Sequence, residues 1–513
     1  MSREFLTPAD RQFMDSRGIT EEAVEAQLAL FRKGTPWIKL HRPCTVDDGI
    51  AVLRPDEMEI LSRRYAEAVA AGRVMKFVPA SGAASRMFQA LLRQFETAPA
   101  IPNDQDAISE RFLTNLDRFA FFDDLEAALY TEGLEVRTCV AQRRIHEILE
   151  HLLTSRGLNY ANLPKGLIKF HRYAAHCRTP LEEHVADATA HTRDRDNVVR
   201  VHFTISPGCE AEVNNSIEEI LECYKATGIK YRVTLSHQHA STDTIAVDTD
   251  NRPFRDRHHR LLFRPGGHGA LLENLQAIQA DIVHLNNIDN VVHGRLKHDT
   301  HVYKRALGGY LVTLQDQIFT HLTMLAAGQV NTSQIEQMFT FAKENLSLSA
   351  PGELLGQSIA EQSRFLFSRL NRPLRVCGVV RNVGEPGGGP FWTESAEGNL
   401  SLQIVEKSQV DTSIEGQRAI VNASTHFNPV DIVCGMRDYQ GQPFRLEAFR
   451  DPDTYFISHK THEGRPLKAL ELPGLWNGAM AYWNTIFVEV PLSTFNPVKT
   501  VNDLLKKEHR PNA

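Results

Sequence analysis

One segment, from Phe263 to Asn290, constrains the fold of this chain more than any other. It reads FRPGGHGALLENLQAIQADIVHLNNIDN and sets a glycine-rich turn, a helix and a short apolar strand in succession. Apolar residues recur at helical spacing in its middle part, and Asp281 to Ile288 is typical of a strand buried in a parallel sheet. Because open α/β sheets bind ligands at the carboxyl ends of their strands, we expect Asp289 to lie at a binding site. An ordinary helix-capping aspartate in a loop is the alternative.

The glycine-rich turn contains Gly266, Gly267 and Gly269 around His268. Residues without a Cβ do not hold the backbone away from a flat or charged ligand, so this turn could bind a base or a ribose. The alternative is a glycine-rich turn in which His268 contacts no ligand.

The strand end is rich in oxygen donors, since Asn287 and Asn290 flank Asp289. Mg2+ prefers oxygen ligands and is commonly held by one or two carboxylates together with phosphates. The sequence therefore predicts Asp289 as a Mg2+ ligand. Asn422 and Asp431 are candidates for a second ligand.

Strands and helices alternate elsewhere in the chain as well. Val74–Pro79 is a short apolar strand, followed by the small residues 80–85 and a helical run from Arg86. Strand, small-residue turn and helix in this order are typical of a phosphate-binding loop. Between residues 163 and 292, strand-like pieces such as VVRVHFTIS and YRVTLSHQ alternate with helical ones. This alternation predicts an α/β fold with a mostly parallel sheet flanked by helices.

The organisation along the chain follows from where helical periodicity interrupts this alternation. We expect a helical N-terminal extension over 1–70 and a nucleotide-binding α/β core over 71–300, with a helical insertion at about 90–160. A second helical insertion is expected over 301–372, and the second part of the core over 373–513. The glycine-rich EPGGGPFW at 385–392 is expected as a mobile loop or, second, as a lid.

Composition excludes several classes of protein. The 513 residues carry 63 acidic and 57 basic side chains, a net charge of −6, without a long basic run, so a nucleic-acid partner is not favoured. No apolar run of about 18 residues and no leader-like N-terminus is found, which predicts a cytoplasmic protein without a membrane partner. The seven cysteines are scattered singly and are expected to be reduced and mostly buried. His293, His298 and His301 could form a metal site, although loop histidines are common.

Seven motifs, in order, resemble those of UDP-sugar pyrophosphorylases. SGAASRM at 81–87 resembles their GGxGTRL signature, and LPKGLIKFH at 163–171 their lysine motif. RPGGHGALLENL and NIDN resemble their PGHGD turn and the VDN that follows it. EKSQVD at 406–411, AIVNASTHF at 419–427 and TFNPVKTVNDLL at 494–505 resemble three later segments. We also expect a closer kinship with a bacterial family known only as a domain of unknown function.

The resemblance implies a nucleotide-diphospho-sugar transferase-like fold and a Mg2+-dependent nucleotidyltransferase that uses a nucleoside triphosphate, UTP favoured, and a sugar 1-phosphate. Arg86 would hold the β- and γ-phosphates, Lys165 the α-phosphate and Lys499 the sugar phosphate, with Asp289 on the metal. The backbone of the first loop would add N–H donors, and Asn422 would contact the sugar. The implied nucleotide-binding residues are Ser81, Gly82, Ala83, Ala84, Ser85, Gln238, Gly267, His268 and Gly269, with Gln238 on the uracil edge. Each lysine, taken singly, is more often a solvated surface residue.

Two departures keep a second interpretation open. Ser81 and Ala84 stand where the signature has glycines, and the chain ends soon after the VKT motif. A catalytically silent relative would bind a nucleotide or a nucleotide sugar and use its helical insertions to engage a protein partner. Retention of all four charged residues favours the transferase, because a binding module could lose the metal carboxylate freely.

Overall fold

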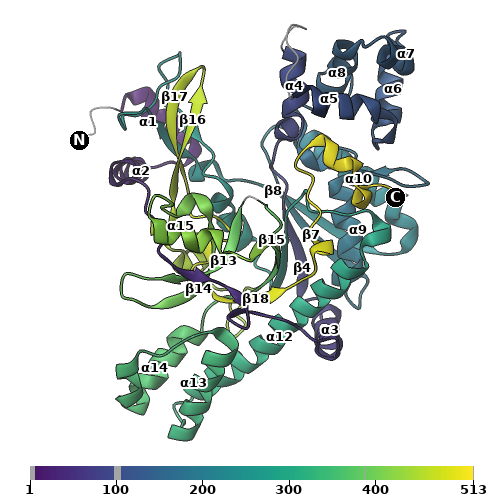
Figure 1. The fold of residues 1–513 in the computed structure, drawn as a ribbon. Helices are drawn as coiled ribbons and strands as arrows, with labels where there is room; N and C mark the ends of the chain where they lie inside the picture. The colour runs from purple at the N-terminus through teal and green to yellow at the C-terminus, as the bar shows by residue number, and fades with distance from the viewer. Residues whose placement is uncertain (1–5, 97–104, 386, 512–513) are drawn as a thin grey trace. The chain divides into compact units, whose positions relative to one another are not determined.

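The computed structural model describes residues 6–96, 105–385 and 387–511. The chain divides into two compact units, each assembled from three stretches of sequence (Figure 1). The first unit contains Met1–Ala66, Gln238–His284 and Ala306–Val490. The second unit contains Glu67–His237, Leu285–Arg305 and Pro491–Ala513.

The second unit is built on three parallel strands. They are β4 (Val74–Pro79), β7 (Val198–Ile205) and β8 (Lys230–His237), in that order. Helices α9 (Pro180–Thr192) and α10 (Glu210–Tyr224) cover one face, where Val201 and Phe203 of β7 meet Val185 of α9. The predicted strand at Val74–Pro79 is confirmed, because a run of β-branched and aromatic residues that is buried on both faces suits only an interior strand.

A helical subdomain extends the second unit. It consists of helices with a common apolar core: α4 (Gln89–Glu96), α5 (Gln105–Thr114), α6 (Phe122–Thr131), α7 (Val136–Ala141) and α8 (Ile145–Leu153). Val498, Val501 and Leu504 from the C-terminal segment are buried in the same core. The segment that carries Lys499 is therefore anchored on both sides of that lysine. Short strands β5 (His171–Arg172) and β6 (Cys177–Arg178) form a hairpin beside α9.

The first unit has a sheet of mixed direction at its centre. In it β12 (Leu374–Arg381) pairs parallel with β18 (Asn484–Glu489) and antiparallel with β15 (His426–Gly435), and β3 (Gly49–Ala51) lies parallel to β18. β2 (Thr45–Val46) lies parallel to β3. β11 (Ile282–Asn286) then carries the chain into the second unit, and the predicted buried strand at this place is confirmed. The predicted α/β class, with a sheet that is mostly parallel, is also confirmed.

Two smaller antiparallel sheets complete the first unit. One has the order β1 (Leu40–Pro43), β13 (Gly388–Glu394) and β14 (Leu400–Glu406). The other has the order β10 (Phe263–Arg264), β9 (Thr244–Val247), β17 (Arg465–Glu471) and β16 (Phe456–His462). Helices α1 (Pro8–Arg17) and α2 (Glu21–Lys33) pack on the latter, and α11 (Leu272–Ala277) and α15 (Glu415–Asn422) lie beside these sheets.

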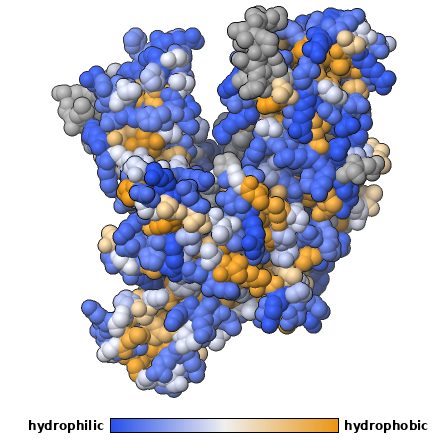
Figure 2. Space-filling view, viewed as in Figure 1, coloured by the Kyte–Doolittle hydropathy of each residue, from blue (hydrophilic) through white to orange (hydrophobic). Residues whose placement is uncertain are grey.

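Long helices flank the first unit. α3 (Pro55–Ala70) crosses α12 (His298–Ala326) so closely that a Cβ on Gly309 would lie 1.9 Å from the Leu61 carbonyl oxygen. α13 (Thr332–Leu346) and α14 (Ile359–Leu370) follow, and Figure 2 shows apolar residues on the surface over them. Leu355 is 59% exposed there. None of the helices in the ranges that the structure describes is long and apolar enough to cross a membrane.

Two sequence predictions are wrong in part. Residues 40–51, expected in a helical extension, form β1, β2 and β3, because β1 and β3 pair with strands more than three hundred residues away, such as Leu40 with Thr393. Residues 388–392, expected as a loop or lid, belong to β13, whose glycines fit against neighbouring chains: a Cβ on Gly389 would lie 2.9 Å from the His426 carbonyl oxygen. The seven cysteines form no disulfide, as expected.

Buried histidines make the stability of the second unit depend on pH. His202 of β7 lies between Thr234 Oγ1 and Ser236 Oγ, each 2.8 Å from a ring nitrogen, and stacks on Phe77. Burial lowers the pKa of His202 to about 4 from its ordinary value of 6.5. Below pH 6.5 the unfolded chain therefore binds a proton that the folded chain does not, so stability present above pH 6.5 is lost as the pH falls.

We expect the free energy of unfolding to fall by about 1.4 kcal/mol per pH unit from this histidine alone between pH 6.5 and 4. His202→Asn should have a correspondingly shallower slope, because the other titrating groups are shared by the two proteins. Urea unfolding of both proteins at several pH values measures the difference. Equal slopes would show that His202 does not titrate in this way.

Candidate active site

Three stretches of the second unit that lie far apart in the sequence meet at Asp289. Asp289 follows β11, Lys165 begins a short 3-10 helix, and Lys499 precedes another. The ammonium nitrogens of Lys165 and Lys499 each lie 3.0 Å from Asp289 Oδ2. The structure thus brings together three of the four charged residues that the sequence singled out.

Backbone hydrogen bonds fix the same three segments to one another. Val498 donates its N–H to the Asp289 carbonyl oxygen at 3.1 Å, and Lys165 Nζ donates to the Val498 carbonyl oxygen at 2.9 Å. Asn290 pairs with Pro497 in an isolated bridge, and Asn290 Oδ1 accepts from the N–H of Asn496 at 2.8 Å. The NIDN turn and the FNPVK segment therefore lie side by side, joined by one isolated bridge.

The two lysines differ in their surroundings. The side chain of Lys165 is 12% exposed and that of Lys499 is 59% exposed, while the Asp289 side chain is 10% exposed. Burial alone raises the pKa of Asp289, but the charges of Lys165 and Lys499 outweigh it and hold the pKa below its ordinary value. The carboxylate is ionised at neutral pH, and the site as a whole carries one excess positive charge.

The loop from Ser81 to Arg86 lies against the Lys165 segment. Lys165 donates its N–H to the Gly82 carbonyl oxygen at 3.0 Å, and Ala84 donates to the Leu163 carbonyl oxygen at 3.1 Å. The Ser81 carbonyl oxygen accepts from Ser206 Oγ at 2.6 Å. On the other side, Met87 accepts from the N–H of Val501 at 3.1 Å. The loop therefore contacts the segments of both lysines.

Several groups of this loop remain available to a ligand. Within the described ranges of the chain, the N–H groups of Ser81, Gly82 and Ala83 donate to no acceptor. The exposed side chain of Arg86 likewise makes no hydrogen bond or ion pair with a described residue, and Ser85 lies half-buried beside it. These N–H groups and the guanidinium can all donate to anionic oxygens.

The described side chains include no ready-made cluster of metal ligands. Among the residues that the structure describes, no group of three or more His, Cys, Asp and Glu side chains has suitable geometry. The possible histidine site is therefore wrong: His293 stacks on Tyr173, and His301 binds Asp187 Oδ1 at 3.0 Å. That Asp289 binds Mg2+ stays a prediction, in which the remaining oxygen ligands would come from phosphates and water.

The glycine-rich turn belongs to the first unit, where it packs against the chain's own backbone rather than lining an open space. A Cβ on Gly269 would lie 2.1 Å from the Pro473 carbonyl oxygen, and one on Gly266 would lie 2.7 Å from that of Thr242. Gly267 adopts a positive φ of 77°. Close backbone packing, with this φ, explains the glycines without a ligand.

His268 in that turn is held by a polar cluster. Its ring stacks on Trp476, with centroids 4.1 Å apart and planes at 6°, and Nδ1 accepts from the N–H of Leu475 at 2.9 Å. Nε2 lies 3.7 Å from Glu406 Oε1, which also accepts from Asn477 Nδ2 at 3.1 Å. The hydrogen-bonding influence of His268 lowers the pKa of Glu406 against the opposing effect of burial. That His268 and Gly267 pack on a base stays a prediction.

Gln238 and Asn422, the other two predicted residues of the first unit, differ in their settings. Gln238 Nε2 donates to Thr242 Oγ1 at 3.3 Å and lies 3.5 Å from Asp243 Oδ1, which forms part of an ion pair with Arg17. Asn422 is the last residue of α15 and is exposed. Their predicted contacts with uracil and sugar stay predictions.

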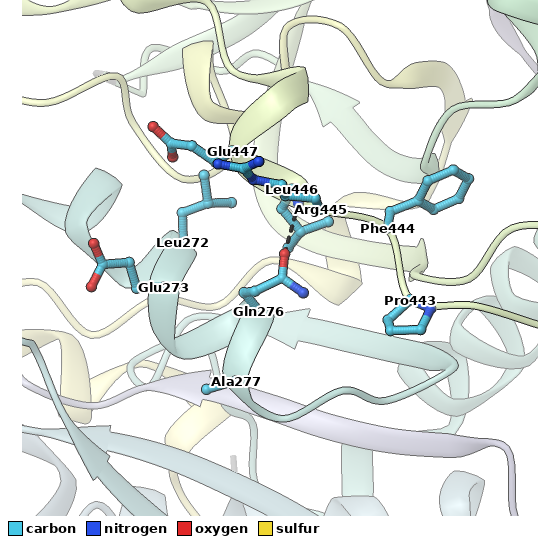
Figure 3. A pocket seen from close by; sticks show the side chains of 9 residues that line it. All are labelled: Leu272, Glu273, Gln276, Ala277, Pro443, Phe444, Arg445, Leu446 and Glu447. Carbon is cyan, nitrogen blue, oxygen red and sulfur yellow. Dashed lines mark hydrogen bonds between the residues drawn. The ribbon is translucent and has the colours of Figure 1, made fainter.

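A pocket of 370 Å³ in the first unit contains none of the predicted site residues (Figure 3). It lies between α11 and residues 443–447, where Gln276 Oε1 accepts from the N–H of Leu446 at 2.7 Å. Its walls include the aliphatic Leu272 and Leu446. The predicted site is therefore elsewhere, at the Asp289 strand end.

The sequence analysis missed a set of buried polar residues behind the lysines. Glu183 of α9 is fully buried and binds Lys297, His171 and Tyr173. One signal was present: His171 ends the LPKGLIKFH motif that contains Lys165. Glu183 itself gave none, because a glutamate in a helix is usually exposed.

Comparisons with known proteins give one family and a set of solved structures. A family model described as "Domain of unknown function (DUF4301)" matches residues 7–510. No curated protein matches. The chain is similar to a mutant UDP-glucose pyrophosphorylase from Leishmania major in complex with UDP-glucose, at 12% identity over 97% of this chain and 77% of that chain, with a TM-score of 0.44.

Two further similar structures come from Trypanosoma brucei. One is a UDP-glucose phosphorylase, at 13% identity over 97% of this chain and 77% of that chain, with a TM-score of 0.46. The other is a uridine diphosphate N-acetylglucosamine pyrophosphorylase in complex with an inhibitor, at 11% identity over 97% and 79%, with a TM-score of 0.47.

The unequal burial of the two lysines predicts unequal costs of removing them. Lys165→Met should lower the free energy of unfolding by about 1–3 kcal/mol, because it removes the buried one of the two ammonium donors to Asp289 and leaves the Val498 carbonyl without its donor. Lys499→Met should cost less than about 1 kcal/mol, as for an exposed ion pair. Chemical denaturation of both variants tests this order, and a larger cost for Lys499→Met would contradict the geometry of the site.

Proposed function

We propose that this chain, which belongs to the DUF4301 family, is a nucleotidyltransferase that joins a nucleoside triphosphate to a sugar 1-phosphate, with UTP the favoured nucleotide. The observation that supports this best is the meeting of two ammonium groups on one carboxylate oxygen after β11, each at 3.0 Å. Phosphates are the ligands that such a concentration of positive charge at a strand end favours.

The reaction asks for positioning and charge rather than proton transfer. An oxygen of the sugar 1-phosphate attacks the α-phosphorus, a new P–O bond forms, and the bond from that phosphorus to the bridging oxygen breaks, releasing pyrophosphate. The attacking oxygen is already anionic at neutral pH, so no general base is needed. Lys165, Lys499 and Arg86 would oppose the negative charge that develops on the phosphates.

The lysines would change partners when substrates bind. In the substrate-free site Asp289 neutralises half of their combined charge and holds both ammonium groups within one hydrogen-bond length of a common oxygen. Phosphate oxygens would take over one or more of these hydrogen bonds. The lysines are thereby kept in place before the substrate arrives, which lowers the ordering cost of binding.

The first loop would supply uncharged donors to the same phosphates. The N–H groups of Ser81, Gly82 and Ala83 are available, and Gly82 has no Cβ to hold a phosphate away. Asp289 would hold a Mg2+ ion together with phosphate oxygens, and this ion would neutralise charge on the triphosphate.

A nucleotide-binding protein without turnover is the second candidate, and one observation favours it. Ala84, which stands where the related signature has glycine, is fully buried, and its N–H already donates to the Leu163 carbonyl oxygen. This amide is not available to a phosphate. Such a protein would bind a nucleotide or a nucleotide sugar and engage a protein partner through its helices.

A pyrophosphate-release assay separates the two candidates. With Mg2+, five nucleoside triphosphates and a panel of sugar 1-phosphates, we expect turnover with at least one pair. Asp289→Ala should lower the rate by at least about 10²-fold with the fold intact, the scale of losing a central electrostatic group. Saturable nucleotide binding without turnover for every pair would support the silent protein, and full activity of Asp289→Ala would remove its assignment.

Gly82 offers a test that separates ligand binding from folding. A Cβ there would meet no atom within 4 Å, and the backbone lies outside the left-handed region, so Gly82→Ala should not destabilise the protein. It should nevertheless weaken UTP binding about 10-fold or more, the scale of one lost charge-assisted hydrogen bond.

Gly352 provides the matched control, since a Cβ there also meets open space without a positive φ. Gly352→Ala should leave both the melting temperature and the UTP affinity unchanged. Calorimetric titration with UTP measures the affinities. Unchanged UTP affinity in Gly82→Ala would exclude the loop from the nucleotide site.

A further inference from the structure

A single buried carboxylate, Glu183, contacts the three segments that carry the candidate catalytic residues, directly or through one intermediate side chain. Glu183 lies on the inner face of α9, where neighbouring Glu182, His184 and Asp187 are also buried. Its side chain is 0% exposed. A fully buried carboxylate must be matched by donors and positive charge, so the identity of its partners is informative.

The partner from the Lys165 segment is His171. Its Nδ1 lies 2.8 Å from Glu183 Oε1, and a carboxylate can only accept there, so Nδ1 carries the proton. Tyr173, two residues further on, donates its hydroxyl to the same oxygen at 2.6 Å. Two side chains just after Lys165 are thus bound by one carboxylate oxygen.

The partner from the Asp289 segment is Lys297. Its ammonium nitrogen lies 2.5 Å from Glu183 Oε2 and 3.3 Å from the Glu183 carbonyl oxygen. The hydroxyl of Tyr173 also accepts from the N–H of Gly294 at 2.7 Å, which adds a second link to this segment. Beside Glu183, His184 Nε2 lies 3.2 Å from the carbonyl oxygen of Ile288, the residue before Asp289.

The link to the Lys499 segment runs through His171. With the proton on Nδ1, His171 Nε2 accepts, and His509 Nδ1 donates to it at 2.9 Å. His509 is buried, and burial lowers its pKa to about 3, so it is neutral in the folded protein. Glu183, by fixing the tautomer of His171, therefore also determines which atom of the C-terminal segment can bind there.

We propose that Glu183 is a positioning residue for the phosphate site, which holds Lys165, Asp289 and Lys499 in register by binding the segments that carry them. The inference rests on the proposed function, since the register matters only if the three side chains act on one ligand. Glu183 does not touch the site residues themselves, Lys165, Asp289 and Lys499. It acts on their segments through His171, Tyr173 and Lys297. A displacement of about 1 Å in such a site can cost ~10²-fold in rate.

The test uses inorganic pyrophosphate as the probe of the site and the full chain throughout. Glu183→Gln keeps the shape of the side chain but removes the charge that Lys297 needs. We expect it to weaken pyrophosphate binding on the order of 10-fold or more. With a substrate pair that the protein converts, the fold-decrease in kcat should exceed the fold-change in KM for UTP, because misplaced groups affect the transition state most.

A double variant separates positioning from simple loss of stability. Glu183→Gln leaves Lys297 as a buried charge without its partner, which destabilises the protein. Adding Lys297→Met removes that charge and should restore the melting temperature, but it does not restore the tie to the Asp289 segment. Pyrophosphate affinity should therefore stay low in the double variant. Recovery of affinity together with the melting temperature would overturn the proposal.

Glu182 supplies the matched control on the same helix turn. It is also buried, but its carboxylate binds His176 and Tyr224, not the segments of Asp289 and Lys499. Glu182→Gln should leave pyrophosphate affinity within about 2-fold of wild type, a much smaller change than the roughly 10-fold loss expected for Glu183→Gln. Equal losses in the Glu182 and Glu183 variants would overturn the role of Glu183.

The outcomes for this proposal and for the transferase are distinguishable. Wild-type protein that binds pyrophosphate without turnover would contradict the transferase and leave the Glu183 comparison fully readable. Wild-type protein that fails to bind pyrophosphate would overturn the phosphate site and the Glu183 proposal with it. Wild-type affinity in Glu183→Gln would overturn the Glu183 proposal alone.

Discussion

The carboxylate of Asp289 is the interaction on which the rest of the candidate site depends. Without it, two ammonium groups that converge on one point would repel each other. With it, Lys165 and Lys499 each lie 3.0 Å from one oxygen of a carboxylate whose side chain is 10% exposed. One excess positive charge remains, and this is the charge that a phosphate can neutralise.

The second unit repeats this arrangement one layer deeper. Glu183 pairs with Lys297, and Asp187 of the same helix binds both Lys304 and Lys76. Burial lowers the pKa of Lys76 to about 7 and so shifts this lysine toward its neutral form. Buried carboxylates with ammonium partners thus connect α9 to β4 and to the start of α12. Such networks are costly unless every member is satisfied, and they then fix one arrangement of the chain.

Much of the fold could be predicted from local patterns, because buried parallel strands are continuous apolar runs. Val74–Pro79 and the strand before Asp289 were found in this way. The meeting of Asp289 with Lys165 and Lys499 was predicted through the motif resemblance, since lysines give no signal of their own. Strands β1 and β3 were missed because their partners lie hundreds of residues away and local composition does not record them.

The glycines show where such reasoning fails. Gly266 and Gly269 were interpreted as room for a ligand, but the chain's own backbone at Thr242 and Pro473 fills that room, which a sequence cannot reveal. Gly82 is the opposite case, since nothing in the described chain lies within 4 Å of its missing Cβ. Glu183 was missed because its function depends on burial, and burial of a glutamate follows only from the assembled fold.

The measurement that tests the central claim most directly is a crystal structure of the chain with UTP and Mg2+. The account predicts phosphate oxygens within hydrogen-bond distance of Lys165 Nζ and Lys499 Nζ, beside the N–H groups of Ser81 to Ala83, with Asp289 released from at least one ammonium group. A nucleotide bound elsewhere, with both lysines still on Asp289, would contradict it.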